Sequence, residues 1–381
     1  MERGKKRKRG RGRAGQVVSL LVCMAVGAAC GLAMARVGDD GTGPGLGGAA
    51  RMAAVLLGFA ASVLLQLLLH EGGHLVFGLL SGYRFCSFRI GSHIWLRRGG
   101  HIVHRRYSLA GTGGQCLMAP PDIRDAGRLP VALYNLGGPL MNLLAGVGSL
   151  LLARALPDGL VAALLQAFGF VGLALALTNG IPLFGGVVDN DGANTLSLLR
   201  GGADARRAFW VQFKVNEAQT DGVRLRDMPA AWFDVPCEGD FRNSMMAGWL
   251  ALRCSWLLDR GRMAEADAAM EALLDSDAGI LGIHRALLEN DRRFLACTGD
   301  AEGLPELPER ARKVLKGMHG FPAVLRTAYA EALCAGKAAE AGKLRAQLEE
   351  IAAAYPYEGE VESERDLMDR AAAQCGSQRN L

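Results

Sequence analysis

Residues 52–80 read MAAVLLGFAASVLLQLLLHEGGHLVFGLL, an apolar run that contains a His-Glu-x-x-His motif at 70–74. The run is longer than the ~20 residues that a helix needs to cross the hydrocarbon core of a bilayer. Ionisable side chains inside a membrane are costly, by at least ~2.5 kcal/mol for acidic ones, and they usually serve a function. The stretch therefore predicts a membrane-spanning helix that carries a functional site.

The spacing of the motif is typical of a metal site. Positions i and i+4 share one face of a helix, so His70 and His74 offer two imidazole nitrogens to one ion, with Glu71 beside it as a base. Zinc with a bound water is the usual occupant of such a site. A chance match is the alternative, but we expect chance matches on polar helices. We interpret the motif as a zinc site.

The composition and three further apolar runs indicate a membrane protein joined to a soluble part. Hydrophobic residues make up 50% of the 381 residues. The other apolar runs cover 17–35, 131–156 and 160–183, each close to the length that spans a bilayer. We predict an α-helical polytopic membrane protein with a bundle of about four transmembrane helices. These are expected at 16–36, 51–80, 130–156 and 159–183.

Residues 1–15 form a basic segment that directly precedes the first apolar run. By the positive-inside rule, this segment stays in the cytoplasm. Nucleic-acid binding is the competing explanation, but the position beside a hydrophobic span favours an orientation signal, so we expect no nucleic-acid partner. The residues at 33–35 resemble a signal-peptide cleavage site. The length of the run favours an uncleaved span, and either outcome predicts the same topology.

The loops indicate the orientation of the spans. Residues 81–129 are rich in arginine and are expected in the cytoplasm, whereas the Gly-rich linker 39–48 has little positive charge and is expected outside. Only residues 157–159 join the third and fourth spans, which predicts a tight turn between antiparallel helices. We therefore predict a multi-pass protein of the cell membrane with a cytoplasmic N-terminus and C-terminal region.

A small cytoplasmic β-hairpin is expected in the loop 81–118, which we assign to a membrane core of residues 51–197. Residues 84–90 alternate in polarity, and 94–96 face 101–103 across a turn at 97–100. The hairpin edge is a candidate site for pairing with an extended substrate, and a hairpin without substrate contact is the alternative. Three histidines in the loop are expected to face water rather than to hold a second metal: His93, His101 and His104.

Residues 198–381 predict a cytoplasmic α-helical domain. Two similar stretches, 258–266 and 333–341, each read as a helix end, a Gly-containing turn and a new helix. This pattern suggests helical hairpins of tetratricopeptide type, although the spacing is not a clean multiple of that repeat. The candidate partners of this domain are a cytoplasmic regulator, the soluble part of a substrate and a second copy of the chain.

The nine cysteines contain no Cys-x-x-Cys pair. This argues against a disulfide framework and against a thiolate zinc site. A third zinc ligand must come from elsewhere, because catalytic zinc typically has three protein ligands plus water. The fourth apolar run ends in 178–192, where Pro and Gly break the helix just as carboxylates appear. We predict Asp191 as the ligand with Asp189 in reserve, and the alternative is that both are solvated boundary acids.

Three elements in this order resemble the site-2 protease family of intramembrane zinc metalloproteases. The likeness is to the short bacterial branch that includes sporulation sigma-factor-processing enzymes. The elements are the motif at 70–74, residues 135–142, which are similar to Asn-x-x-Gly-Pro-x-x-Asn, and residues 190–192, which are similar to the Asp-Gly motif. Together they cover residues 52–195. The segment 114–121 is also similar to one in Gram-positive relatives.

The resemblance implies Zn²⁺ held by His70, His74 and Asp191, with Glu71 as the general base. It also implies that Asn142 lies near the substrate or its oxyanion, and a helix-packing amide is the alternative role. The chain departs from the family pattern in reading Asn-Asp-Gly rather than the commoner Leu-Asp-Gly. No PDZ or CBS domain is recognisable in the sequence.

The expected function is that of a metalloendopeptidase embedded in the lipid bilayer. It would cleave a membrane-anchored protein substrate in or near a transmembrane segment, as in regulated intramembrane proteolysis. One alternative is a catalytically silent membrane scaffold with structural zinc that recruits partners through its helical tail. A metal transporter is a second alternative, which four dissimilar predicted helices disfavour because transporters commonly contain internal repeats.

Overall fold

The computed structural model describes residues 24, 27–28, 48–107, 112–184, 187–299 and 306–378. Contacts divide the chain into two compact units, with Met1–Tyr83 and Pro130–Leu196 in the first and Arg84–Leu129 and Ser197–Leu381 in the second. The predicted basic segment at 1–15 lies outside the described residues, as does nearly all of the predicted span at 16–36.

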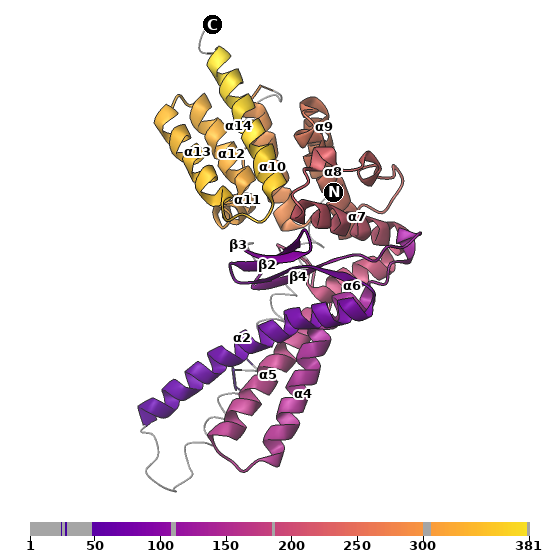
Figure 1. Ribbon diagram of the computed structural model, residues 1–381, viewed down its shortest axis with the longest axis vertical. Helices are drawn as coiled ribbons and strands as arrows, with labels where there is room; N and C mark the ends of the chain where they lie inside the picture. Colours follow the sequence, from indigo (N-terminus) through magenta and orange to yellow (C-terminus); the bar gives the residue numbers. More distant parts are fainter. Residues whose placement is uncertain are drawn as a thin grey trace. The chain divides into compact units, whose positions relative to one another are not determined.

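Three long apolar helices form the described body of the first unit: α2 (Gly48–Leu80), α4 (Gly137–Ala155) and α5 (Leu160–Gly180). The short α3 (Ala132–Asn135) precedes α4. Helix α6 (Asp191–Arg200) follows α5 (Figure 1). All three long helices are long and apolar enough to cross a membrane, α2 over Leu56–Leu80. They correspond to the spans predicted at 51–80, 130–156 and 159–183. The predicted fourth member of the bundle is not confirmed.

The first unit buries polar side chains and exposes apolar ones. Side chains such as Leu57, Leu80 and Leu151 are more than half exposed. Gln66 and Asn142, in contrast, are fully buried between the helices. Intramembrane polar groups face the interior of a bundle, while lipid covers the apolar exterior, so this distribution is consistent with a membrane protein.

Glycines allow the long helices to approach closely. A Cβ atom on Gly73 of α2 would lie only 2.3 Å from the carbonyl oxygen of Gly137 on α4. A Cβ atom on Gly146 of α4 would lie 3.0 Å from the carbonyl oxygen of Gly169 on α5. Small residues at helix crossings are the usual packing device in membranes. The glycines thus bring α4 against the face of α2 that carries the histidine motif.

A four-stranded antiparallel sheet opens the second unit, in the order β3-β2-β1-β4. Its strands are β1 (Arg84–Ile90), β2 (His93–Arg98), β3 (His101–Arg106) and β4 (Gly114–Ala119). The predicted hairpin is confirmed as β2 and β3, in which Leu96 pairs with Val103. The turn is shorter than predicted, because only Gly99 and Gly100 join the strands. Both have positive φ, as two-residue hairpin turns require.

The sheet belongs to the same compact unit as the C-terminal helices. The sequence instead predicts that residues 81–118 belong to the membrane core. Within the second unit, Arg98 donates a 2.9 Å hydrogen bond to the carbonyl oxygen of Thr220. The ring of Tyr107, after β3, meets the rings of Tyr355 and Tyr357 edge-on. Strand β4 was also not predicted, because its pairing with β1 is a tertiary contact and its sequence does not alternate.

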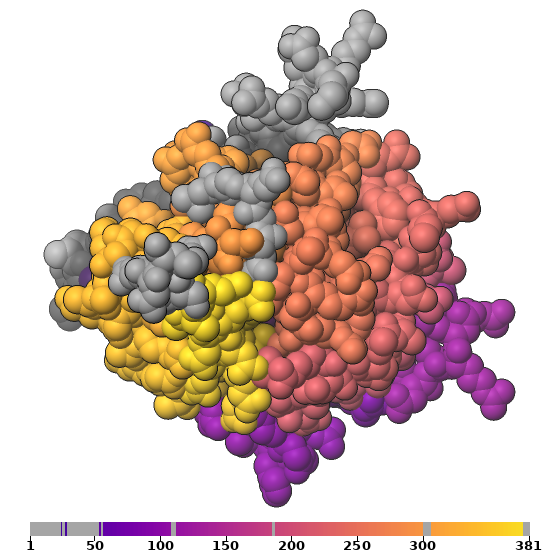
Figure 2. Space-filling model, turned by 90° about the horizontal axis from the view of Figure 1, so that it is seen from above, coloured from indigo at the N-terminus to yellow at the C-terminus, as the bar shows by residue number. Residues whose placement is uncertain are grey.

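The rest of the second unit is helical, as predicted for residues 198–381. The α-helices are α7 (Gly202–Thr220), α8 (Ser244–Asp259), α9 (Met263–Asp275), α10 (Gly282–Cys297), α11 (Glu309–Lys316), α12 (Pro322–Cys334), α13 (Ala338–Ala352) and α14 (Glu358–Gln378). Short 3₁₀ turns are η1 (Ala126–Arg128), η2 (Leu225–Asp227) and η3 (Ala230–Trp232). Helix α14, yellow in Figure 2, packs against α12.

The two similar stretches found in the sequence are helical hairpins. The stretch 258–266 contains the turn between α8 and α9, and 333–341 contains the turn between α12 and α13. Each turn has a glycine with positive φ, Gly261 and Gly336, which ends the preceding helix. The cysteines in the described part of the chain are free thiols.

Candidate metal centre

Three predicted ligands meet inside the first unit. His70 and His74 lie one turn apart on α2, and Asp191 is the first residue of α6. The Nε2 atoms of the two histidines are 3.3 Å apart. Oδ2 of Asp191 lies 3.1 Å from Nε2 of His70, and Oδ1 lies 3.5 Å from Nε2 of His74. In the described part of the chain, this is the one group of three or more His, Cys, Asp or Glu side chains placed to share a metal ion.

The distances between the two imidazole nitrogens and the carboxylate oxygens of Asp191 are close to those between ligands of a tetrahedral site. Zinc binds histidine nitrogen at about 2.0–2.1 Å and carboxylate oxygen at about 2.0–2.2 Å, so donors around it are about 3.3–3.5 Å apart. The two Nε2 atoms are 3.3 Å apart. Oδ2 of Asp191 is 3.1 Å from Nε2 of His70, and Oδ1 is 3.5 Å from Nε2 of His74. Three donors at these distances leave a fourth tetrahedral position for water or substrate.

Asn142 determines which nitrogen of His70 carries hydrogen. The amide nitrogen of Asn142 donates 2.8 Å hydrogen bonds to the backbone oxygen and to Oε1 of Gln66. Its Oδ1 therefore faces Nδ1 of His70, 2.7 Å away, and accepts a hydrogen bond from it. In the neutral imidazole, Nε2 is then left with a lone pair toward the candidate metal position.

A backbone carbonyl orients His74 in the same way. Nδ1 of His74 lies 2.9 Å from the oxygen of Tyr134, which is only an acceptor, so Nδ1 donates. Two imidazole lone pairs and a carboxylate then face one another, and Oδ2 of Asp191 is buried without a hydrogen-bond partner in the described residues. A shared cation satisfies all three acceptors. Donation from the second ring nitrogen is the usual support of a metal-binding histidine.

Gly138 keeps the space beside the two histidines open. A Cβ atom on Gly138 of α4 would lie 2.6 Å from Nε2 of His70 and 2.6 Å from Nε2 of His74. Any larger residue would therefore press on the same nitrogens that face Asp191. The glycine thus preserves room at the donor atoms, as an ion with an open coordination position requires.

Asp191 is held at the start of α6 by the residues on either side of it. Gly192 packs against the end of α5 so closely that a Cβ atom would lie 2.2 Å from the carbonyl oxygen of Gly180. This contact explains why glycine follows the aspartate.

Asn190 holds the loop before Asp191 against the end of α5 by hydrogen bonds. Its amide nitrogen donates 2.7 Å hydrogen bonds to the carbonyl oxygens of Thr178 and Ile181 at the end of α5. Its Oδ1 accepts hydrogen bonds from the backbone N–H groups of Leu183 and Ala193. Asn190 therefore has a structural role at the start of α6. An Asn just before a helix is a common N-cap, which is the signal by which sequence reasoning could have found it.

The remaining predicted site residues lie as follows. Glu71 is buried on α2 next to His70, and Asn142 is buried behind His70 with its amide oxygen and nitrogen both bonded within the protein. This geometry fits the packing role of Asn142 better than contact with an oxyanion. Asp189 does not belong to the three-residue group. In the sheet, His93 and His104 form an exposed pair with ring nitrogens 3.0 Å apart.

Comparisons with protein families, with curated proteins and with solved structures find no match to this chain.

Replacing Asn190 by Leu is expected to weaken zinc binding by about 10–100-fold, the usual effect of losing a residue that supports a metal ligand. The substitution removes the hydrogen bonds that anchor Asp191 and leaves every ligand in place. Zinc affinity is measured by competition with a chelator. The matched control is Asn194→Leu on the same helix, whose side chain makes no hydrogen bond to the described residues. Equal affinities in the two variants would show that Asn190 does not position the ligand.

Proposed function

We propose that this protein is an intramembrane zinc metalloprotease of the site-2 protease type. It hydrolyses a peptide bond in or near the transmembrane segment of a membrane-anchored substrate. One observation carries the proposal: Nε2 of His70, Nε2 of His74 and the carboxylate of Asp191 converge inside a unit of apolar helices. The resemblance of the motifs at 70–74, 135–142 and 190–192 to that family supports it.

Each of the predicted site residues has a separate role in the proposed reaction. His70, His74 and Asp191 would hold a zinc ion, which would act as a Lewis acid and lower the pKa of water from ~15.7 toward ~7. Glu71, the residue after His70, takes the proton of the attacking water and returns it to the leaving amine. Asn142 keeps His70 in the tautomer that presents Nε2.

The substrate must be locally unwound before its backbone is attacked. The amides of a membrane helix are all hydrogen-bonded within the helix, so an intact helix presents no accessible extended peptide. The proposal therefore includes an extended stretch of substrate next to the cut site.

The open side of the metal site favours an enzyme over a scaffold. A structural zinc site usually closes its fourth position with a protein ligand. Among the described residues only three ligands converge, and Gly138 leaves space beside two of them.

The distribution of basic residues supports the proposed orientation in the membrane. The arginine-rich segment 81–129 and the basic segment 1–15 support a cytoplasmic location of the N-terminus and the second unit.

The test supplies the enzyme with its own substrates. Membranes are prepared from cells in which the only form of this protein carries Glu71→Gln. These membranes are expected to accumulate uncleaved substrates. Adding purified zinc-loaded wild-type protein should create new termini within or beside transmembrane segments, detected by mass spectrometry of peptide ends. Adding the Glu71→Gln protein should create none. If no new termini appear although zinc is bound, the scaffold alternative is favoured and the protease proposal fails.

A further inference from the structure

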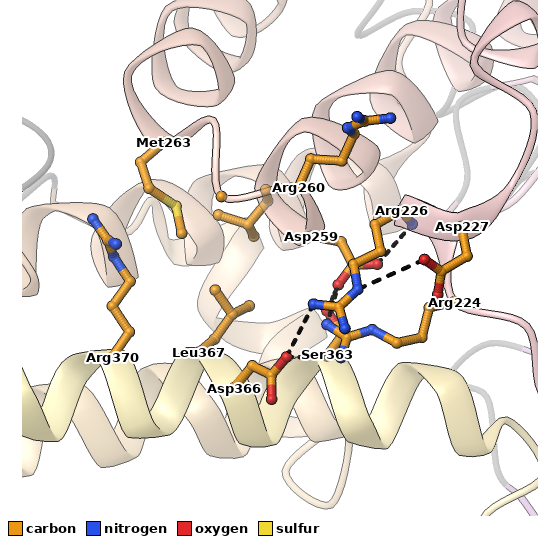
Figure 3. A pocket seen from close by; sticks show the side chains of 12 residues that line it. Arg224, Arg226, Asp227, Asp259, Arg260, Met263, Ser363, Asp366, Leu367 and Arg370 are labelled. Atoms are coloured by element: carbon orange, nitrogen blue, oxygen red, sulfur yellow. Dashed lines mark hydrogen bonds and ion pairs between the residues drawn. The ribbon is translucent and has the colours of Figure 1, made fainter.

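A cavity of about 480 Å³ lies in the second unit, and none of the three metal ligands lines it. It is bounded by η2, by the turn between α8 and α9, and by α14. Figure 3 shows Arg370 at one end, a network of Arg224, Arg226 and Asp366 at the other, and Leu367 between them. The cavity therefore combines charged ends with an apolar middle.

Arginines from three separate elements line the cavity: Arg224 and Arg226 at η2, Arg260 after α8, and Arg370 on α14. This is unusual in its surroundings, because acidic residues outnumber basic ones in 198–381. Arginine presents a planar fork of N–H donors that matches carboxylate and phosphate groups. The cavity is thus a local concentration of donors for an anionic group.

The aspartates in the cavity wall hold the arginines in place. Asp259 is nearly fully buried and accepts hydrogen bonds from Arg224 at 2.6 Å, from the backbone N–H of Arg226 at 2.8 Å and from Ser363 at 2.5 Å. Asp366 accepts from Arg224 at 2.7 Å and from Arg226 at 3.2 Å. These contacts fix both guanidinium groups before any ligand arrives, and preorganised donors lose less entropy on binding.

Arg224 retains an unused donor. The residue is only 7% exposed, and its Nε atom is buried without a hydrogen-bond partner in the described residues. A buried N–H without a partner is costly, and a bound acceptor removes that penalty. Arg226, in contrast, keeps 44% of its side chain exposed and is reachable from solvent. Of the arginines at η2, Arg226 is thus the one that a ligand reaches directly, whereas the Nε atom of Arg224 is enclosed by the protein.

The apolar wall distinguishes between possible anions. Leu258, Met263 and Leu367 line the cavity, and each is more than nine-tenths buried in the protein. Inorganic phosphate gains nothing from these side chains. A peptide contacts both parts when an apolar residue lies next to Asp or Glu, because the apolar side chain meets the small exposed part of the wall and the carboxylates meet the arginines.

We propose that this cavity binds an acidic peptide segment that carries an apolar residue between carboxylates, contributed by the soluble part of the membrane-anchored substrate. The identification of the segment as part of a substrate rests on the proposed function, whereas the binding chemistry does not. The cavity holds the substrate by its soluble part and so raises its local concentration at the enzyme. Because the contacts are between opposite charges, the affinity falls as the salt concentration rises.

The experiment uses full-length protein with Glu71→Gln, loaded with zinc, so that nothing is cleaved. The probes are a fluorescent Asp-Glu-Leu-Leu-Asp-Glu peptide and the matching Lys-Lys-Leu-Leu-Lys-Lys peptide, and binding is read by fluorescence anisotropy. We expect saturable binding of the acidic peptide only. Combining Arg226→Glu with Arg370→Glu should weaken it by about 10-fold or more, because hydrogen bonds between charged groups are lost and like charges are brought together.

The matched control combines Arg253→Glu with Arg312→Glu, two exposed arginines of the same unit outside the cavity, and should leave binding within about 2-fold. Absence of acidic-peptide binding, or equal weakening in the control, overturns the proposal. So does binding of inorganic phosphate alone, or arginine-dependent binding of anionic vesicles without peptide binding. Zinc content and cleavage of a membrane peptide without an acidic segment are measured in parallel on the wild-type chain. These readouts report the proposed function separately.

Discussion

Glu71→Gln is expected to bind zinc like the wild-type chain and to lose proteolysis. The amide has the shape of the carboxylate but does not take a proton from water, and the three ligands are untouched. General acid–base catalysis contributes about 10²–10⁴-fold, so the cleavage rate should fall by that factor. The measurements are zinc content by elemental analysis and the rate at which new peptide termini appear.

The control for this prediction is Glu306→Gln, the same change at a side chain that is 91% exposed in the second unit. It should leave both zinc content and rate unchanged. A Glu71→Gln protein that cleaves at the wild-type rate would remove Glu71 from the mechanism. A protein that loses zinc as well would make Glu71 a ligand rather than a base.

Asp191→Ala is expected to abolish stoichiometric zinc binding. Removing a residue that merely supports a ligand weakens metal binding by about 10–100-fold, so removing a ligand should weaken it by more than about 100-fold. The two imidazoles that remain are too few to hold the ion at the concentrations present in a purified sample. Zinc affinity by chelator competition and cleavage rate should fall together.

The chain offers a matched control two residues away. Asp189→Ala removes the carboxylate that was the alternative predicted ligand. Asp189 lies outside the three-residue group. This variant should keep its zinc. The opposite outcome, in which Asp189→Ala loses zinc and Asp191→Ala keeps it, would reassign the third ligand and contradict the geometry at α6.

Much of the candidate site was predictable because its signals are local. The i, i+4 spacing of His70 and His74 follows from helical periodicity, and an apolar run of this length predicts a helix by itself. The hairpin of β2 and β3 was predictable because residues 94–96 and 101–103 flank a turn segment, 97–100, that contains two glycines. Asp191 required an additional argument, that a zinc site needs a third ligand and that a carboxylate follows the break after α5.

The parts that were missed depend on contacts between distant segments. The sequence does not show that Gly138 lies against both histidines, that Tyr134 accepts from His74, or that Asn190 binds the end of α5. Strand β4 is visible only through its pairing with β1. The grouping of the sheet with the C-terminal helices has the same cause, because it rests on side chains such as Arg98 and Tyr107.

The most direct test of the central claim is X-ray absorption at the zinc edge on the purified full-length protein. We predict one zinc ion per chain, bound by nitrogen and oxygen donors at about 2.0–2.2 Å, with fewer nitrogen donors in His74→Ala. A folded, homogeneous wild-type protein without zinc would contradict the account. So would a spectrum dominated by sulfur donors at about 2.3 Å, because no cysteine belongs to the described site.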